Sequence, residues 1–120
     1  MAVVQSQRSR LASPRVRNAR HALLDASATA LLQPVREALC EPTRTQIVRA
    51  LAAGPLSVSE LAAILNRSKS ATSQHLRVLR TGGVVTAQRR GRIVQYSLLP
   101  HPMVQATVDV LDRAAAIAAV

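Results

Sequence analysis

The chain has 120 residues, with sixteen basic residues against six acidic ones and a formal net charge of +10 at neutral pH. That length suffices for one domain with a modest core, and the charge favours a polyanionic partner, either nucleic acid or an anionic membrane surface. One tyrosine is the only aromatic residue, which argues against a protein that binds single strands by stacking bases on aromatic platforms.

Residues 1–18 predict a mobile basic arm that turns helical near Val16. Five arginines and no acidic residue occur in the first twenty positions, and Pro14 and several serines interrupt any helical period. The arm either adds contacts to DNA phosphates or is a solvated tail. Residues 19–120 are expected to form a single domain.

Apolar residues recur at helical spacing from His21 to Cys40, so the sequence predicts a helix there that Pro34 kinks or divides. A second helix is expected from Thr43 to Ala53. Pro42 suits a helix start, and Gly54-Pro55 suits a stop.

Residues 57–80 predict two short amphipathic helices joined by a tight polar turn. Ser57 and Glu60 have the spacing of a capping box at the first helix, and Ser68 can cap the second. The second helix of such a helix-turn-helix fits the major groove of DNA, where every base pair presents a distinct pattern of donors and acceptors. The polar residues expected to face DNA from this helix are Lys69, Ser70, Ser73, Gln74 and Arg77.

A hairpin is expected next, because Val84–Gln88 and Ile93–Leu98 are rich in β-branched residues and flank the run Arg89–Arg92. An arginine-rich loop beside a recognition helix can reach the DNA backbone or minor groove. Its candidate contacts are Arg89, Arg90 and Arg92. The strand residues expected to face the core are Val94, Tyr96 and Leu98.

The last predicted helix, Met103–Ala119, is apolar on every side from Ala114 onward. Such a helix must be buried, and a chain of this size has little with which to cover it. The terminal helices are therefore expected to pack across a homodimer. The expected dimer contacts are Leu24, Leu31, Val35, Val104, Val108, Leu111, Ala115 and Ala118.

In chain order these elements make a mainly α fold with a small β-hairpin, a winged helix-turn-helix with extra N- and C-terminal dimerisation helices. The segments ALCEPTRTQIVRAL, SVSELAAIL, SKSATSQHLRVLRTGGVV and RRGRIVQYSL together resemble the ArsR-type winged-helix regulators of bacteria over about residues 36–100. The resemblance implies a homodimer that represses transcription until a ligand binds. It also implies a sensor, of metals in many members and of thiol oxidants or small molecules in others.

The chain departs from the metal-sensing patterns of that family. Leu56–Glu60 contains no thiol where the first family site has cysteines, and no histidine follows His101 on the last helix. His101 and Asp112 are eleven residues apart, about 16 Å along a helix, which is too far to share one ion within a chain. We therefore expect no metal and no other cofactor. Cys40 is expected to be a buried, inert thiol, and His75 a structural residue on the core side of its helix.

The sequence predicts a sequence-specific transcriptional regulator, a homodimeric repressor that binds an inverted-repeat operator in double-stranded DNA and is released by an unidentified inducer. It does not predict an enzyme, because no set of residues has a catalytic spacing. One cysteine, no secretory signal and no run of about 18 apolar residues favour a cytoplasmic protein without a membrane partner.

Two alternatives remain open at this stage. One is a metal- or redox-responsive sensor with an atypical site, for example at His21, Cys40 or His101. The other is a basic architectural DNA-binding protein that has no sensor and binds many sequences almost equally.

Overall fold

The computed structural model describes residues 13–120, which divide into two compact units with the boundary between Ala30 and Leu31. The sequence had placed a boundary between the arm and the domain at 18/19. The predicted contacts of residues 1–12 lie outside the described residues. No helix in the described part of the chain is long and apolar enough to cross a membrane.

The described part of the first unit contains α2 (Pro14–His21) and α3 (Ala26–Ala30). Ser13 caps α2 by accepting a hydrogen bond from the backbone N–H of Val16, and neither helix buries a residue. The continuous helix expected from His21 is wrong, because α2 ends there. A new helix starts after Asp25, whose carboxylate accepts from the N–H of Ala28 at 2.7 Å.

The second unit begins with α4 (Gln33–Leu39) and α5 (Pro42–Leu51), both with proline in the first turn. Pro34 thus starts a helix, where its missing N–H costs nothing. Side chains of α5 secure the end of α4: Arg44 Nε donates to the carbonyl of Glu37 at 2.8 Å, and Thr45 Oγ1 donates to that of Ala38 at 2.8 Å. These bonds satisfy carbonyls that the end of a helix leaves without partners.

Next come α6 (Val58–Leu65) and α7 (Lys69–Thr81), the predicted helix-turn-helix. The capping box is confirmed: Ser57 accepts from the N–H of Glu60, whose carboxylate accepts from the N–H of Ser57. Asn66 ends α6 in the left-handed conformation at φ 52°, which asparagine tolerates better than most residues. Ser68 then caps α7, as predicted.

A three-stranded antiparallel sheet follows, in the order β1 (Leu56–Ser57), β3 (Ile93–Leu98), β2 (Val85–Arg90). Strand β2 continues through Arg90, two residues further than predicted, and the hairpin turns on Gly91-Arg92 alone. Gly91 has φ +65°, which such two-residue turns require.

The short strand β1 was not predicted. It pairs with the middle of β3, with Leu56 opposite Tyr96 and Ser57 opposite Gln95. Tyr96 and Leu98 pack against the core as expected, whereas Val94 is half-buried and lies outside that cluster.

The core of this unit is formed by α4, α5, α6, α7, the strands and the first half of α8 (Pro102–Ala118). Its largest fully buried hydrophobic side chains are Ile47, Leu61, Leu76, Leu79, Val48, Val84, Val85 and Val104. Gly82, at the end of α7, is buried against α4, and a Cβ there would lie 2.6 Å from Cγ of Glu37. Glycine therefore permits α7 to approach α4 closely.

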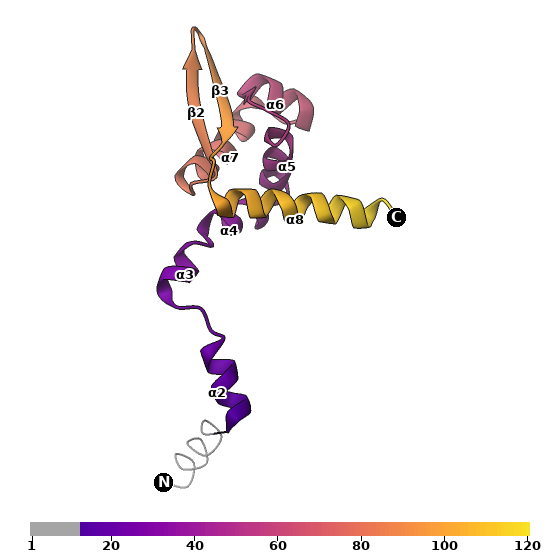
Figure 1. Ribbon diagram of the computed structural model, residues 1–120. Coiled ribbons are helices and arrows are strands. Elements are labelled where there is room, and N and C mark those ends of the chain that lie inside the picture. The colour runs from indigo at the N-terminus through magenta and orange to yellow at the C-terminus, as the bar shows by residue number, and fades with distance from the viewer. Residues whose placement is uncertain (1–12) are drawn as a thin grey trace. The chain divides into compact units, whose positions relative to one another are not determined.

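Three of the dimer contacts predicted on α8 are instead buried within the chain. Val104, Val108 and Leu111 are 2%, 8% and 9% exposed, so these side chains are buried in the core of their own chain and leave little surface for a partner. After Leu111 the helix runs past the other elements of the unit (Figure 1), and every residue from 112 to 120 is exposed. Within the described residues of this unit, nothing supplies the burial expected for this apolar end.

Candidate nucleic-acid interface

The second helix of the helix-turn-helix, α7, divides into a buried and an exposed face. Thr72, Leu76 and Leu79 are fully buried, which fixes the rotation of the helix on the domain. The predicted reading residues are all exposed and lie on the opposite side: Lys69, Ser70, Ser73, Gln74 and Arg77. The structure thus presents these five side chains together on one outward face.

Arg80 belongs to the same face, although it is not among the DNA-facing residues that the sequence predicts. It is exposed, and with Ser73 and Arg77 it has the spacing i, i+4, i+7 of one helical side. That spacing was the signal available in the sequence. A guanidinium at the far end of α7 extends the basic surface along the length of the helix.

The wing hairpin, β2 and β3, projects from the body of the unit beside α6 and α7 (Figure 1). Arg89 and Arg90 lie near its end, opposite Val94 and Ile93, and Arg92 lies in the turn; all three arginines are exposed. Consecutive strand residues point to opposite faces of a sheet. Arg89 and Arg90 therefore present charge on the two sides of the hairpin rather than at one point.

All the charged side chains of the recognition helix α7 and of the wing are positive. Between Glu60 and Asp109 the chain has no acidic residue and seven basic ones. No internal carboxylate in that stretch competes with DNA phosphates for the arginines of α7 and the wing. A basic surface built on a helix and an adjacent loop is the electrostatic footprint of a DNA-binding protein.

His75 anchors α7 rather than facing outward, as predicted. Its side chain is half-buried, and its Nδ1 lies 3.7 Å from a carboxylate oxygen of Glu41, the N-cap residue of α5. That carboxylate also accepts a hydrogen bond from the N–H of Arg44 at 2.9 Å. The Arg44 N–H and, less strongly, the charge of His75 hold the pKa of Glu41 below its ordinary value of 4.5.

The expectation of a buried thiol at Cys40 is wrong. Cys40 ends α4, is exposed, and its Sγ accepts a hydrogen bond from Nη2 of Arg44. The helical pattern that placed it inside does not extend past Leu39, because the chain turns there to begin α5.

The sequence interpretation considers an atypical metal site at His21, Cys40 or His101. Across residues 13–120, no group of three or more His, Cys, Asp or Glu side chains is placed to hold a metal ion. His101 is the N-cap of α8, and its Nδ1 accepts from the N–H of Met103 at 3.1 Å.

The helix-turn-helix region is similar in sequence to known bacterial regulators. Residues 41–87 match the model of a family described as bacterial regulatory protein, arsR family. The HTH-type transcriptional regulator NmtR of Mycobacterium tuberculosis is 43% identical over 82 residues, which cover 68% of each chain.

Solved structures agree with the sequence matches. HlyU from Vibrio cholerae superposes with a TM-score of 0.68 at 31% identity, over 75% of this chain and 96% of that one. A homodimeric winged helix-turn-helix DNA-binding domain, Mb0332 from Mycobacterium bovis, gives a TM-score of 0.63 at 28% identity, over 78% of this chain and 89% of that one. Both neighbours thus share the fold over at least three quarters of this chain.

Proposed function

The chain belongs to the arsR family of bacterial regulatory proteins, which are winged helix-turn-helix transcriptional regulators, and from this premise we propose that it is a cytoplasmic homodimeric repressor that binds an inverted-repeat operator, and not an enzyme. The observation that carries the proposal is the outward face of α7, which presents five polar or basic side chains above a fully buried opposite face.

Specificity is assigned to α7. Ser70, Ser73 and Gln74 are short or amide-bearing side chains that can hydrogen-bond base edges in the major groove. Lys69, Arg77 and Arg80 suit the phosphates that flank those bases. The wing arginines Arg89, Arg90 and Arg92 reach the backbone or minor groove beside the site.

Dimer formation is assigned to α8 and its neighbours. Val110 and Ile117 are 54% and 67% exposed, and they lie on the side of α8 that faces away from the core. Of the residues predicted from the sequence, Leu24, Leu31, Val35, Ala115 and Ala118 keep exposed or half-exposed surface for this role. A two-fold axis would present two copies of α7 to successive major grooves, and this calls for an operator with matching symmetry.

A sensor-less architectural protein remains the second candidate, because the surplus of basic residues alone supports binding to any duplex. The two candidates differ in discrimination between sequences. Selection of bound DNA from a random pool should yield a symmetric consensus. The ratio of the affinity for that consensus to the affinity for scrambled DNA is then measured by fluorescence anisotropy.

The matched variants for that measurement are Gln74→Ala and Gln46→Ala. Gln74→Ala should reduce discrimination by roughly 1–3 kcal/mol per affected base contact while affinity for scrambled DNA changes little. Gln46, exposed on α5 and outside both the proposed DNA surface and the proposed dimer surface, serves as the control and should leave both affinities unchanged. Selection without any consensus, together with equal affinities for all duplexes, would favour the architectural protein.

A further inference from the structure

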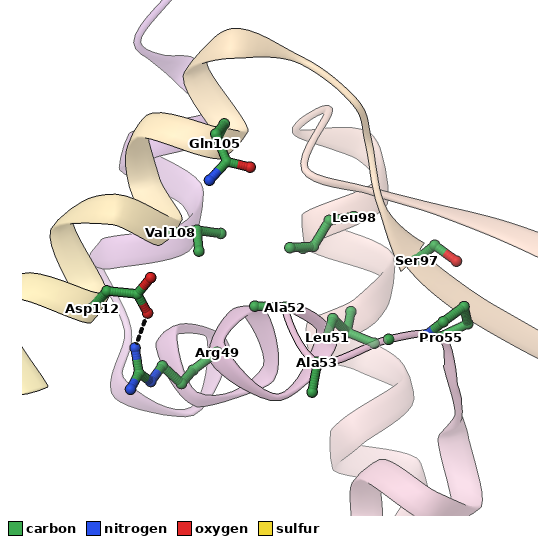
Figure 2. Close-up of a pocket in the computed structure, with 11 residues that line it drawn as sticks. Arg49, Leu51, Ala52, Ala53, Pro55, Ser97, Leu98, Gln105, Val108 and Asp112 are labelled. Carbon is green, nitrogen blue, oxygen red and sulfur yellow. Dashed lines mark hydrogen bonds and ion pairs between the residues drawn. The ribbon is translucent and has the colours of Figure 1, made fainter.

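An open pocket of about 680 Å³ lies where α5, β3 and α8 meet, on residues that the DNA interface does not use. It is bounded by the last turn of α5, the loop that follows through Pro55, the end of β3 and three residues of α8 (Figure 2). Its volume is in the range of pockets that hold small organic molecules.

The charged groups of the pocket form one pair. Arg49 of α5 and Asp112 of α8 make an ion pair across it, drawn as a dashed line in Figure 2. Both side chains keep considerable exposure, 42% and 60%. An exposed pair of this kind adds little stability, so another carboxylate can replace Asp112 at the guanidinium at small cost.

The rest of the lining mixes polar and apolar groups around a small apolar area. Leu98 and Val108 extend into the pocket from β3 and α8 (Figure 2). Gly54 leaves open space where a side chain would stand, because a Cβ placed there meets no atom within 4 Å. Gln105 and Ser97 add an amide and a hydroxyl at the edge.

We propose that this pocket binds a small organic carboxylate with an apolar body, and that the carboxylate takes the place of Asp112 on Arg49. The guanidinium offers a planar pair of donors that matches a carboxylate. Leu98 and Val108 contact the apolar part of the ligand. Arg49 is the basic residue among those that line the pocket.

Binding there would act on the dimer helix. Asp112 directly follows Leu111, the last buried residue of α8, so the ion pair links α5 to this helix at the point where it leaves the body of its unit. Exchange of the pair removes that link. Leu98 is also paired with Val85 of the wing hairpin. The resulting loss of DNA affinity rests on the proposed function, whereas ligand binding itself does not.

The pocket stays open when two copies pair through the outer side of α8. Successive residues of an α-helix are about 100° apart, so Val108 in the pocket and Val110 on the outer side are about 200° apart. A partner packed on Val110 and Ile117 therefore leaves Val108 uncovered, and dimer contacts at Ala115 and Ala118 lie beyond the pocket, toward the C-terminal end of the helix.

The test is titration of the full chain with benzoate, followed by calorimetry and by amide shifts in NMR spectra. Benzoate should shift the amides of Gly54 and Ser97, and benzyl alcohol and acetate should each bind more weakly. Arg49→Gln should lower benzoate affinity at least about tenfold, because a charged hydrogen bond is lost. Asp112→Asn should raise it severalfold, because the competing carboxylate is removed.

Arg113→Gln is the matched control, since it lies one position beyond Asp112 and does not line the pocket. Opposite changes in benzoate affinity for Arg49→Gln and Asp112→Asn would not arise from a merely structural ion pair. The proposal is overturned by equal effects of those two variants, by benzyl alcohol binding as tightly as benzoate, or by shifts elsewhere on the chain.

A separate arm measures the affinity of the selected operator with and without saturating benzoate. Release of DNA by benzoate from the wild type, with less release from Arg49→Gln, supports the regulatory role. Benzoate binding with unchanged DNA affinity overturns it. A chain that binds no DNA at all refutes the proposed function, while the calorimetric titration still decides the pocket.

Discussion

Nδ1 of His75, on the recognition helix α7, lies 3.7 Å from a carboxylate oxygen of Glu41, the residue that caps α5. One carboxylate therefore serves two elements: it accepts from the backbone N–H of Arg44 at the start of α5, and it attracts the imidazole of α7. The orientation of the DNA-reading helix is thus tied to the N-terminus of a core helix.

This arrangement predicts a pH-dependent contribution of Glu41 to stability. Its pKa in the folded state is lowered, so the stabilisation is present above the ordinary pKa of 4.5 and is lost as pH falls through the folded value. Glu41→Gln should destabilise the protein at pH 7, and the difference from wild type should shrink steadily below pH 4.5. Urea unfolding at several pH values measures this, and a difference that stays constant down to pH 3 would contradict it.

Gly82→Ala should destabilise the fold. The added Cβ would lie 2.6 Å from Cγ and 3.0 Å from Cβ of Glu37, so the Glu37 side chain, α4 or α7 must shift. Overpacking of this kind costs about 1–3 kcal/mol, readable as a lower urea midpoint. Thr81→Ala, at the exposed neighbouring position, should stay within about 0.5 kcal/mol of wild type. Equal stability of Gly82→Ala and Thr81→Ala would show that the contact between α4 and α7 accommodates an added methyl group.

The wing should contribute affinity without discrimination. Arg90→Ala or Arg92→Ala should weaken binding to operator and scrambled DNA by similar factors. The log–log dependence of affinity on salt should flatten by about one unit for each subunit engaged. Anisotropy titrations at four salt concentrations give the slope. A wing variant that changes which sequence is preferred would instead make the wing a reader of minor-groove width.

A charge placed on the outer side of α8 should dissociate the dimer and leave a folded monomer. Ile117→Asp alters a residue that is 67% exposed in the single chain, so the fold should persist while the dimer dissociates. Leu111→Asp should instead unfold the protein, because it buries an unpaired charge. Light scattering and circular dichroism separate the two results. An Ile117→Asp variant that keeps the dimer mass would place the interface elsewhere.

Local signals in the sequence predicted most of the helix-turn-helix. Ser57, Glu60 and Ser68 are capping residues whose bonds reach only three positions along the chain, so their role can be predicted without tertiary structure. The exposed face of α7 followed in the same way from helical spacing. The strand β1 did not, because it depends on pairing with β3, which is distant in sequence. The end of β2 at Arg90 did not either, because it depends on how tightly the hairpin turns at Gly91-Arg92.

Periodicity also predicted that α8 has an apolar face, but not what covers it. Val104, Val108 and Leu111 have the spacing of an interface stripe, and in the structure the protein's own core covers them. A repeat of apolar residues carries the same signal whether the neighbour belongs to the same chain or to a second copy. The exposure of Cys40 and the pocket beside Arg49 likewise depend on how separate segments meet.

Ser57 has two roles at once: it pairs with Gln95 of β3, and it caps α6. The wing and the helix-turn-helix therefore share a residue and should move as one rigid piece. On the proposed interface, the span along the duplex between the bases under α7 and the backbone under the wing is consequently a fixed length. A half-site with one base pair inserted between them would have to give up one of the two sets of contacts, so the phasing of each half-site follows from the way the wing joins the helix-turn-helix.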